Sequence, residues 1–290
     1  MEYLSNGIIE VAISHKGAEL QSLKKVKAEH EYMWQGDKTY WERQAPLLFP
    51  IVGNAWNKEI IVDGEAYPID KHGFLRDMQF STLRAERLEV TLRASRSNDT
   101  TVSFPWPFEV DVTYSIRRNV LTQKWIVRNV GDKTMHFQIG GHPGFNLPDY
   151  KSTDELHGYL SFNKTNQLTS AVIRPGGYVN GEEYKIDLTD GRLPLTNHTF
   201  DCDTILDCTG LLNRVTIHNK NNKPYLTTIF QTPVLALWSP CGGNAPFVCI
   251  EPWYGCCADE NTPCEFSNRR FMNHLEPGQE FVGGMEIIVE

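Results

Sequence analysis

The sequence lacks the features of a membrane-spanning or nucleic-acid-binding chain. No segment approaches the roughly 18 apolar residues of a spanning helix, and the N-terminal MEYLSN has neither the basic nor the apolar region of a signal peptide. Basic residues are in deficit, since 28 Lys and Arg face 36 Asp and Glu for a net charge of -8. An acidic surface gains nothing from a polyanion, so we expect a cytoplasmic protein that binds a small molecule and neither nucleic acid nor membrane.

Cysteine pairs with metal-site or disulfide spacing are also missing. The seven cysteines are an odd number, and all of them lie in the last third of the chain. The chain contains no Cys-x-x-Cys or His-x-x-x-His pair, and the adjacent Cys256 and Cys257 cannot easily both point at one tetrahedral ion. We therefore expect reduced thiols and no zinc site built from these cysteines.

Long amphipathic helices and Ser/Gly-rich linkers are absent as well, and short runs of β-branched and aromatic residues recur instead between turn signals. The expected strands are Ile8–Ile13, Ile60–Val62, Val110–Ile116, Leu121–Val127, Val215–His218 and Tyr225–Gln231. The expected turns are Asp63–Gly64, Arg118–Asn119, Pro175–Gly177 and Asn180–Gly181. This pattern predicts an all-β chain, a large antiparallel sandwich with few short helices, as a single domain over residues 1–290. A two-domain arrangement stays open, although no boundary is visible.

Two histidines lie in segments that mix polar groups into apolar surroundings. His72 stands in KHGFLRD, shortly after the apolar and proline-containing stretch of residues 41–53. His142 stands in GGHPGF, where paired glycines allow close backbone approach and Pro143 fixes the chain directly after the imidazole. Such a loop can hold an imidazole toward a cavity. The alternatives are a structural or surface histidine at position 72 and a plain tight turn at position 142.

Glu251 ends an apolar run and is followed directly by Pro252, Trp253 and Tyr254. Burying a carboxylate there is unfavourable unless it has partners or a function. Desolvation would raise the pKa of the carboxyl toward the range of a general base, and the aromatic rings offer flat faces to a sugar. The alternatives are a strand-end glutamate in a surface ion pair, and a metal site whose ligands are His72, His142 and Glu251.

In chain order, GAEL at 17–20, PLLFP at 46–50, HGFLR at 72–76, GHPGF at 141–145, LW at 237–238 and IEPWYG at 250–255 form an ordered set. This set resembles the LacX-like branch of the aldose 1-epimerase (galactose mutarotase) family over nearly the whole chain. The resemblance implies a β-supersandwich that binds a hexose on its concave face, with no metal or organic cofactor in the chemistry. It also implies an isomerase that interconverts α and β anomers.

The resemblance assigns roles by motif. Glu251 would take the proton of the anomeric hydroxyl, His142 would protonate the ring oxygen, and the ring would open and close again on the other face of the aldehyde. His72 would hydrogen-bond the sugar near the reacting oxygens. The other expected substrate contacts are Arg76, Arg43, Asp203, Trp238 and Trp253, with Asp201 as the alternative to Asp203.

Several alternatives concern the substrate. Arg43 and Arg76 permit a phosphorylated hexose without requiring one, so a hexose-6-phosphate 1-epimerase is an alternative. A non-catalytic carbohydrate-binding sandwich is another, because fold does not fix function. Such a lectin would have no use for a buried glutamate opposite a histidine. A monomer and a homodimer are equally compatible with the sequence, and the residues around Cys256 and Asn268–Arg270 depart from the pattern of the branch.

Overall fold

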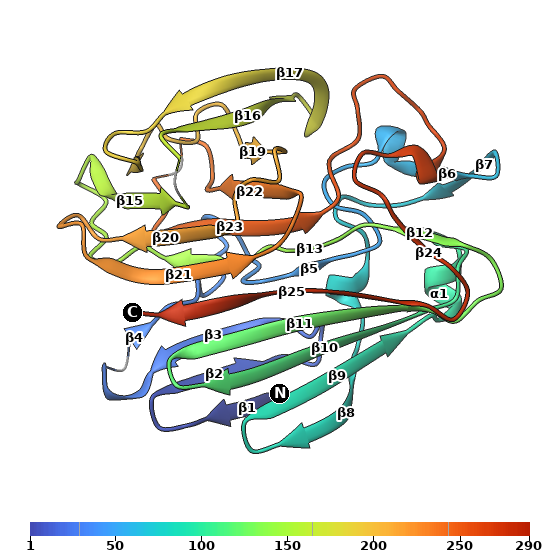
Figure 1. The fold of residues 1–290 in the computed structure, drawn as a ribbon, viewed down its shortest axis with the longest axis horizontal. Helices are drawn as coiled ribbons and strands as arrows, with labels where there is room; N and C mark the ends of the chain where they lie inside the picture. The colour runs from blue at the N-terminus through green and yellow to red at the C-terminus, as the bar shows by residue number, and fades with distance from the viewer. Residues whose placement is uncertain (29, 164, 243) are drawn as a thin grey trace.

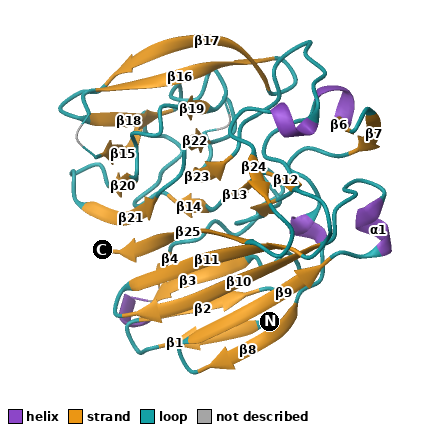
Figure 2. Cartoon of the chain, turned by 45° about the vertical axis from the view of Figure 1, so that its right-hand side comes forward, coloured by secondary structure: helices purple, strands orange, loops and turns teal. Residues whose placement is uncertain are grey.

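The computed structural model describes residues 1–28, 30–163, 165–242 and 244–290. Antiparallel strands in two large and three small sheets account for most of the regular structure (Figure 1). Helices are short, and Figure 2 shows them in purple between the strands. They are α1 (Asn98–Thr101) and the 3-10 turns η1 (Val26–Ala28), η2 (Trp56–Lys58), η3 (Leu75–Asp77) and η4 (Phe266–Asn268). The predicted all-β class with few short helices is confirmed.

The larger sheet has nine strands and occupies the lower and left parts of the view in Figure 1. Its order is β18 (Arg192–Thr196), β15 (Leu156–Phe162), β20 (Arg214–His218), β21 (Pro224–Phe230), β25 (Glu280–Val289), β11 (Val120–Asn129), β10 (Phe108–Arg117), β9 (Glu89–Ser95) and β8 (Ser81–Glu86).

The second large sheet has eight strands and carries the cavity described below. Its order is β17 (Tyr178–Asp187), β16 (Gln167–Arg174), β19 (Ile205–Asp207), β22 (Val234–Trp238), β23 (Phe247–Tyr254), β13 (Ile139–Gly141) and β5 (Leu47–Leu48), with β14 (Gly144–Asn146) beside β23. The small sheets are β1 (Glu2–Ser5), β2 (Ile9–Ile13), β3 (Leu20–Lys25) and β4 (His30–Glu31); β6 (Glu59–Val62) and β7 (Glu65–Pro68); and β12 (Met135–Phe137) and β24 (Asn273–Leu275).

All six expected strands are present, as β2, β6, β10, β11, β20 and β21. Three expected turns are also confirmed, since Asp63–Gly64 joins β6 to β7, Arg118–Asn119 joins β10 to β11 and Pro175–Gly177 joins β16 to β17. The expected turn at Asn180–Gly181 is wrong. These residues lie inside β17, where the register with β16 shifts, so the turn-forming pair accommodates extra residues in a continuing strand.

Alternate side chains of β23 lie on opposite faces of the strand and belong to two different clusters. Val248 and Ile250 belong to the main hydrophobic core, together with Trp125 of the nine-stranded sheet. Phe247 and Cys249 belong to a separate cluster on the opposite face of the strand. Because successive side chains of a strand point to opposite faces, Glu251 shares the face of Cys249 and not that of the core.

The predicted alternative of a strand-end glutamate in a surface ion pair is therefore wrong. Glu251 is 1% exposed, lies within β23 and is paired in register with Ala236 of β22. The small side chain of Ala236 leaves space beside the carboxylate. Among the described residues, no helix combines the length and apolar character needed to cross a membrane.

Candidate active site

A cavity of about 600 Å³ opens on the face of the eight-stranded sheet that carries Glu251. This volume lies within the range of roughly 300–1,000 Å³ typical of small-molecule sites. The cavity brings together every residue that the sequence predicted for the site: Arg43, His72, Arg76, His142, Asp203, Trp238, Glu251 and Trp253. Segments more than 200 residues apart in the sequence meet there, so the grouping is a product of the fold.

Glu251 and His142 meet at the cavity wall. The Glu251 Oε2 atom lies 3.2 Å from the His142 Nε2 atom, and the two residues are 1% and 8% exposed. The contact is close, but it is not an aligned hydrogen bond, because Glu251 Oε2 has no hydrogen-bond partner among the described residues. The His142 Nδ1 atom is likewise buried without one. A buried carboxylate and imidazole without fixed partners are available to a bound molecule.

Burial shifts the pKa of Glu251 and that of His142 so that the neutral form of each side chain is favoured. It raises the pKa of Glu251 well above its usual range, an effect that Lys71 opposes and Asp203 reinforces. It lowers the pKa of His142 to about 3, helped by the positive charges of Lys71, Arg76 and Arg43. Burial thus disfavours the charged form of both groups, which is the direction expected for a carboxyl and an imidazole that exchange protons with a bound molecule.

The His142 segment is more than a plain tight turn. His142 and Pro143 connect β13 to β14, and both of these strands pair with β23. The His142 backbone N–H donates to Pro46 O at 3.1 Å, and Pro143 O accepts from the Ile250 N–H at 3.2 Å. The loop is thereby tied on both sides, which holds the imidazole beside Glu251.

His72 is neither exposed nor charged. It is 6% exposed, and burial lowers its pKa well below the usual value, with the charge of His142 as the next cause. The Gly53 backbone N–H donates to His72 Nδ1 at 3.0 Å, while the His72 N–H donates to Gly53 O at 2.8 Å. Since Nδ1 accepts, the neutral ring carries its proton on Nε2 and offers one donor.

Glycine is required at position 53. Its φ is +66°, and a Cβ atom there would lie 2.4 Å from Cys257 Sγ. The backbone at position 53, which holds His72 by two hydrogen bonds, can therefore pack against Cys257 only because glycine has no side chain.

Aromatic rings enclose the pair. The Trp41 ring stacks on His142 with centroids 4.8 Å apart and planes inclined by 25°. Trp238 approaches the same imidazole edge-on at 5.8 Å. Trp253 occupies space that Gly140 leaves free, since a Cβ at position 140 would lie 2.4 Å from the Trp253 Cδ1 atom. The imidazole is thus oriented mainly by stacking, because its Nδ1 atom makes no hydrogen bond within the described chain.

One side of the cavity carries excess positive charge. Asp77 is ion-paired with Arg43 at 3.2 Å, with Lys16 at 3.2 Å and with Arg76 at 3.8 Å. Arg76 also donates from Nη2 to Lys71 O at 2.7 Å, while its buried Nε makes no hydrogen bond among the described residues. Arg43 and Arg76 thus bring two guanidinium groups to the same side of the cavity, which suits an oxygen-rich or anionic group.

The structure separates the two candidate aspartates. Asp203 lines the cavity, adopts φ +71° and accepts hydrogen bonds from the Thr204 N–H at 2.6 Å and the Thr204 hydroxyl at 2.9 Å. Asp201 instead contacts His198 at 2.8 Å and does not line the cavity. Asp203 remains the predicted substrate contact, and its second carboxylate oxygen is free of the contacts that hold the first.

The cluster that could ligate a metal differs from the predicted one. His142, Cys249 and Glu251 each offer one ligand atom, and these atoms all lie within 4.8 Å of one another. His72 is not a member of this group, so the predicted set of His72, His142 and Glu251 is wrong as a ligand set. The sequence signal for Cys249 was available, because it precedes Glu251 by two positions on a strand and must share its face.

The sequence model of the family described as aldose 1-epimerase matches residues 3–287. The chain belongs to the aldose 1-epimerase family. The LacX proteins of Lactococcus lactis subsp. lactis, chromosomal and plasmid, are each 29% identical over 267 residues, which is 87% of either chain. The predicted resemblance to the LacX-like branch is confirmed.

Solved structures agree with this membership in the aldose 1-epimerase family. A galactose mutarotase-like protein from Lactobacillus casei is 28% identical, with a TM-score of 0.93 and 100% of each chain covered. A galactose mutarotase related enzyme from Lactobacillus acidophilus is 29% identical, with a TM-score of 0.91 and coverage of 100% and 97%. Family membership indicates a sugar substrate and an isomerase type of enzyme.

Sequence reasoning missed several parts of this aldose 1-epimerase site. Trp41 begins the stretch of residues 41–53 and Lys71 directly precedes His72, yet the sequence assigned neither residue to the site. Gly53, Cys241 and Cys257 also line the cavity and were not foreseen. No local pattern distinguishes these residues, because their position depends on how distant loops meet above β22 and β23.

Proposed function

We propose that the protein is an aldose 1-epimerase that interconverts the α and β anomers of a hexose, with Glu251 as base and His142 as acid. The observation that carries this proposal is the contact between the two groups. A buried carboxylate and a buried imidazole lie 3.2 Å apart on the wall of a sugar-sized cavity, and the carboxylate oxygen has no hydrogen bond among the described residues.

The reaction moves one proton off the sugar and one proton on. The Glu251 carboxylate accepts the proton of the hydroxyl on the anomeric carbon, and the electron pair of that O–H bond forms the aldehyde C=O. The bond between the anomeric carbon and the ring oxygen breaks as His142 delivers a proton to that oxygen. Rotation about the exposed bond and closure with the two roles reversed gives the opposite anomer. Each positioned group contributes typically about 10²–10⁴-fold.

The cycle returns both groups to their starting state, because ring closure reverses the proton transfers of ring opening. The positive charge of Lys71 lowers the pKa of Glu251, which is the direction that favours the carboxylate as base. We assign to the Nε2–H of His72 a hydrogen bond to a sugar oxygen near the reacting centre, and to Trp238 and Trp253 the contacts with the face of the ring; all three residues line the cavity.

A hexose phosphate is the second candidate substrate, and a specific observation favours it. Lys16, Arg43 and Arg76 all share Asp77, and Lys71 lies on the same cavity. A phosphate on the sugar would neutralise this excess charge by charge-assisted hydrogen bonds. The same residues also serve a free sugar, whose hydroxyls accept hydrogen bonds from guanidinium groups.

Polarimetry tests the proposal directly. Freshly dissolved α-D-glucose, α-D-galactose and α-D-glucose 6-phosphate are followed with and without protein, and we expect faster approach to equilibrium rotation for at least one of them. Glu251→Gln and His142→Ala should each remove about 10²–10⁴-fold of the acceleration. Circular dichroism serves as the control for folding.

Two outcomes would contradict this assignment. A wild-type protein that accelerates none of these sugars while binding them would be a non-catalytic carbohydrate-binding sandwich. Full activity in Glu251→Gln would show that another group is the base. Arg76→Met distinguishes the two substrate classes, because it should raise KM for the phosphorylated sugar more than for the free one.

A further inference from the structure

Cys249 lies directly behind the acid-base pair. It precedes Glu251 by two positions in β23 and shares its face, and its residue is 0% exposed. Its neighbours are Trp34, Phe247, Trp41 and Trp238, which form a small aromatic cluster beneath the cavity. Cys249 does not line the cavity itself. A thiol in this position takes no part in the proposed reaction, although it adjoins both reacting groups.

The ligand atoms of His142, Cys249 and Glu251 already converge. All three lie within 4.8 Å of one another, and Glu251 Oε2 and His142 Nε2 are 3.2 Å apart. Tetrahedral zinc with bonds of about 2.0–2.3 Å requires ligand atoms roughly 3.3–3.7 Å apart. The nitrogen–oxygen contact thus nearly meets this requirement. The sulfur lies within 4.8 Å of the other two atoms, so it has to approach them by at most about 1.5 Å. The unpartnered, buried Glu251 Oε2 is an independent sign that this point can accept a ligand.

We propose that His142, Cys249 and Glu251 form a site for a thiophilic divalent ion such as Zn²⁺. One imidazole nitrogen, one thiolate sulfur and one carboxylate oxygen are a set that suits zinc and cadmium and is unsuited to magnesium or calcium, which prefer oxygen. The cavity side supplies the fourth position to water. On binding, the thiol proton and any proton on the Glu251 carboxyl pass to solvent, and lone pairs of the sulfur, the carboxylate oxygen and the imidazole nitrogen form the bonds to the ion.

Metal in this site would inhibit the enzyme. The ion occupies the Glu251 oxygen that accepts the sugar proton and the His142 nitrogen that delivers one, so neither group can act while it is bound. This inhibitory consequence rests on the proposed function, whereas the metal site itself does not. Sugar and ion should compete, because they require the same two side chains.

Cobalt binding tests the site without reference to activity. Co²⁺ added to the reduced protein should produce a thiolate-to-cobalt absorption band that saturates at one equivalent and disappears on addition of Zn²⁺. Cys249→Ser and Cys249→Ala should both lose the band, with circular dichroism as the folding control. The matched control is Cys208→Ser, because Cys208 forms a separate thiol contact with Cys256 at 4.0 Å. That variant should keep the band.

The affinity and inhibition data complete the test. Loss of an outer-shell partner of a metal already costs about 10–100-fold in affinity, so removal of the Cys249 ligand should weaken Zn²⁺ binding by more than about 100-fold. Zn²⁺ should slow the wild type and Cys208→Ser alike, spare Cys249→Ser, and be overcome by sugar. Mg²⁺ should have no effect.

A band or a Zn²⁺ affinity that is unchanged in both Cys249 variants would overturn the site. Zn²⁺ inhibition that persists in Cys249→Ser would overturn the proposal that the ion inhibits from this site. If the wild type accelerated no sugar, the proposed function would fail, and the cobalt spectra would still decide the metal site.

Discussion

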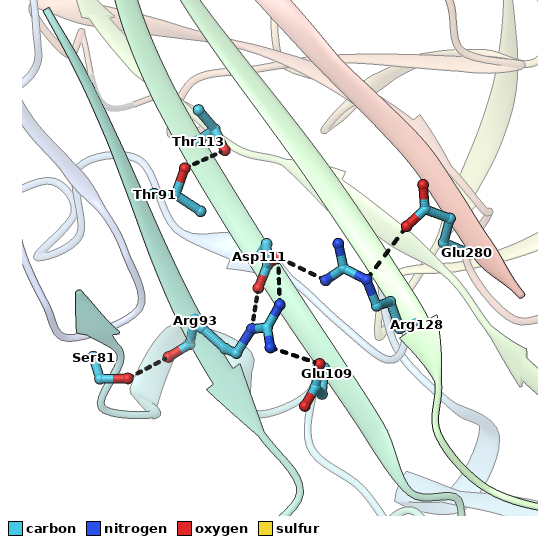
Figure 3. A network of polar contacts seen from close by, with 8 residues as sticks. All are labelled: Ser81, Thr91, Arg93, Glu109, Asp111, Thr113, Arg128 and Glu280. Carbon is cyan, nitrogen blue, oxygen red and sulfur yellow. Dashed lines mark hydrogen bonds and ion pairs between the residues drawn. The ribbon is translucent and has the colours of Figure 1, made fainter. Parts of the chain in front are cut away.

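Two carboxylates in the middle of strands are almost equally buried, and their surroundings are opposite. The Asp111 side chain on β10 is 4% exposed and the Glu251 side chain on β23 is 2% exposed. Figure 3 shows Asp111 between Arg93 and Arg128, with contacts of 2.6 Å to each. Those arginines pair in turn with Glu109 at 2.9 Å and Glu280 at 3.3 Å. Glu251 has instead one imidazole neighbour and no aligned hydrogen bond to Oε2 within the described residues.

The difference in partners reverses the sign of the pKa shift. Burial alone would raise the pKa of Asp111, but the hydrogen bonds from Arg93 and Arg128 outweigh it and lower the pKa below the usual value. At Glu251 burial dominates, and the pKa rises. The hydrogen bonds therefore outweigh desolvation at Asp111, whereas desolvation prevails at Glu251 and leaves its carboxyl open to a partner from the cavity.

The largest expected effect comes from removing the charge at Glu251. Glu251→Gln should lower the mutarotation rate by about 10²–10⁴-fold without lowering stability. The sign follows from linkage. A raised carboxyl pKa contributes stability below the ordinary value of about 4.3, and this contribution is lost as the pH rises through the folded-state pKa. Urea unfolding at pH 5 and pH 8 should show that the free energy of unfolding of Glu251→Gln increases relative to that of the wild type as the pH rises. A variant that loses stability at pH 8 would contradict the comparison.

Asp111→Asn should show the converse, with a loss of stability and unchanged activity. Removing hydrogen bonds to a charged group costs about 1.5–3 kcal/mol, and the lower end applies because Arg93 and Arg128 are 27% exposed and can be rehydrated. Urea unfolding at pH 7 measures the difference. The lowered pKa means that this contribution is present above about pH 4 and is lost as the pH falls through the folded-state pKa of Asp111. The difference in free energy of unfolding between the wild type and Asp111→Asn should accordingly become smaller at acidic pH.

A smaller effect is expected at Trp41, which acts as a positioning residue for His142. An aromatic stack is worth about 0.5–1.5 kcal/mol, so Trp41→Leu should lower kcat by roughly 2–10-fold, and Trp41→Phe should restore most of it. The ring face also favours a positively charged imidazole, so its loss should lower the pKa of His142 and move the limb of the pH–rate profile that His142 controls to lower pH. An unshifted profile would indicate a purely structural role for Trp41.

The sequence was informative where local pattern and tertiary role coincide. Alternation located β10 and β11, and polar residues in apolar settings located Glu251, His142 and His72. It failed at Asn180–Gly181, where pairing with β16 overrides the turn preference of the dipeptide. That residues 1–290 form a single domain stays a prediction, and a single cooperative unfolding transition would support it.

Other parts of the site were beyond sequence reasoning for physical reasons. The choice between Asp201 and Asp203 depends on a loop conformation with positive φ at Asp203, which nothing in the neighbouring residues dictates. Trp41 reaches His142 from a segment about 100 residues away in the chain. Cys249 could have been predicted from strand periodicity, because residues two positions apart on a strand lie on the same face and Cys249 precedes Glu251 by two.

The two faces of β23 link the folding of the core to the position of Glu251. Val248 and Ile250 enter the core, while Cys249 and Glu251 lie on the opposite face of the strand, and the pairing of Glu251 with Ala236 fixes this arrangement. A slip of one residue would put Ile250 beside His142 and drive a carboxylate into the apolar core, which folding would reject. Correct pairing of β23 with β22 therefore also sets Glu251 beside His142, so a chain that forms its core in register has positioned the proposed acid-base pair.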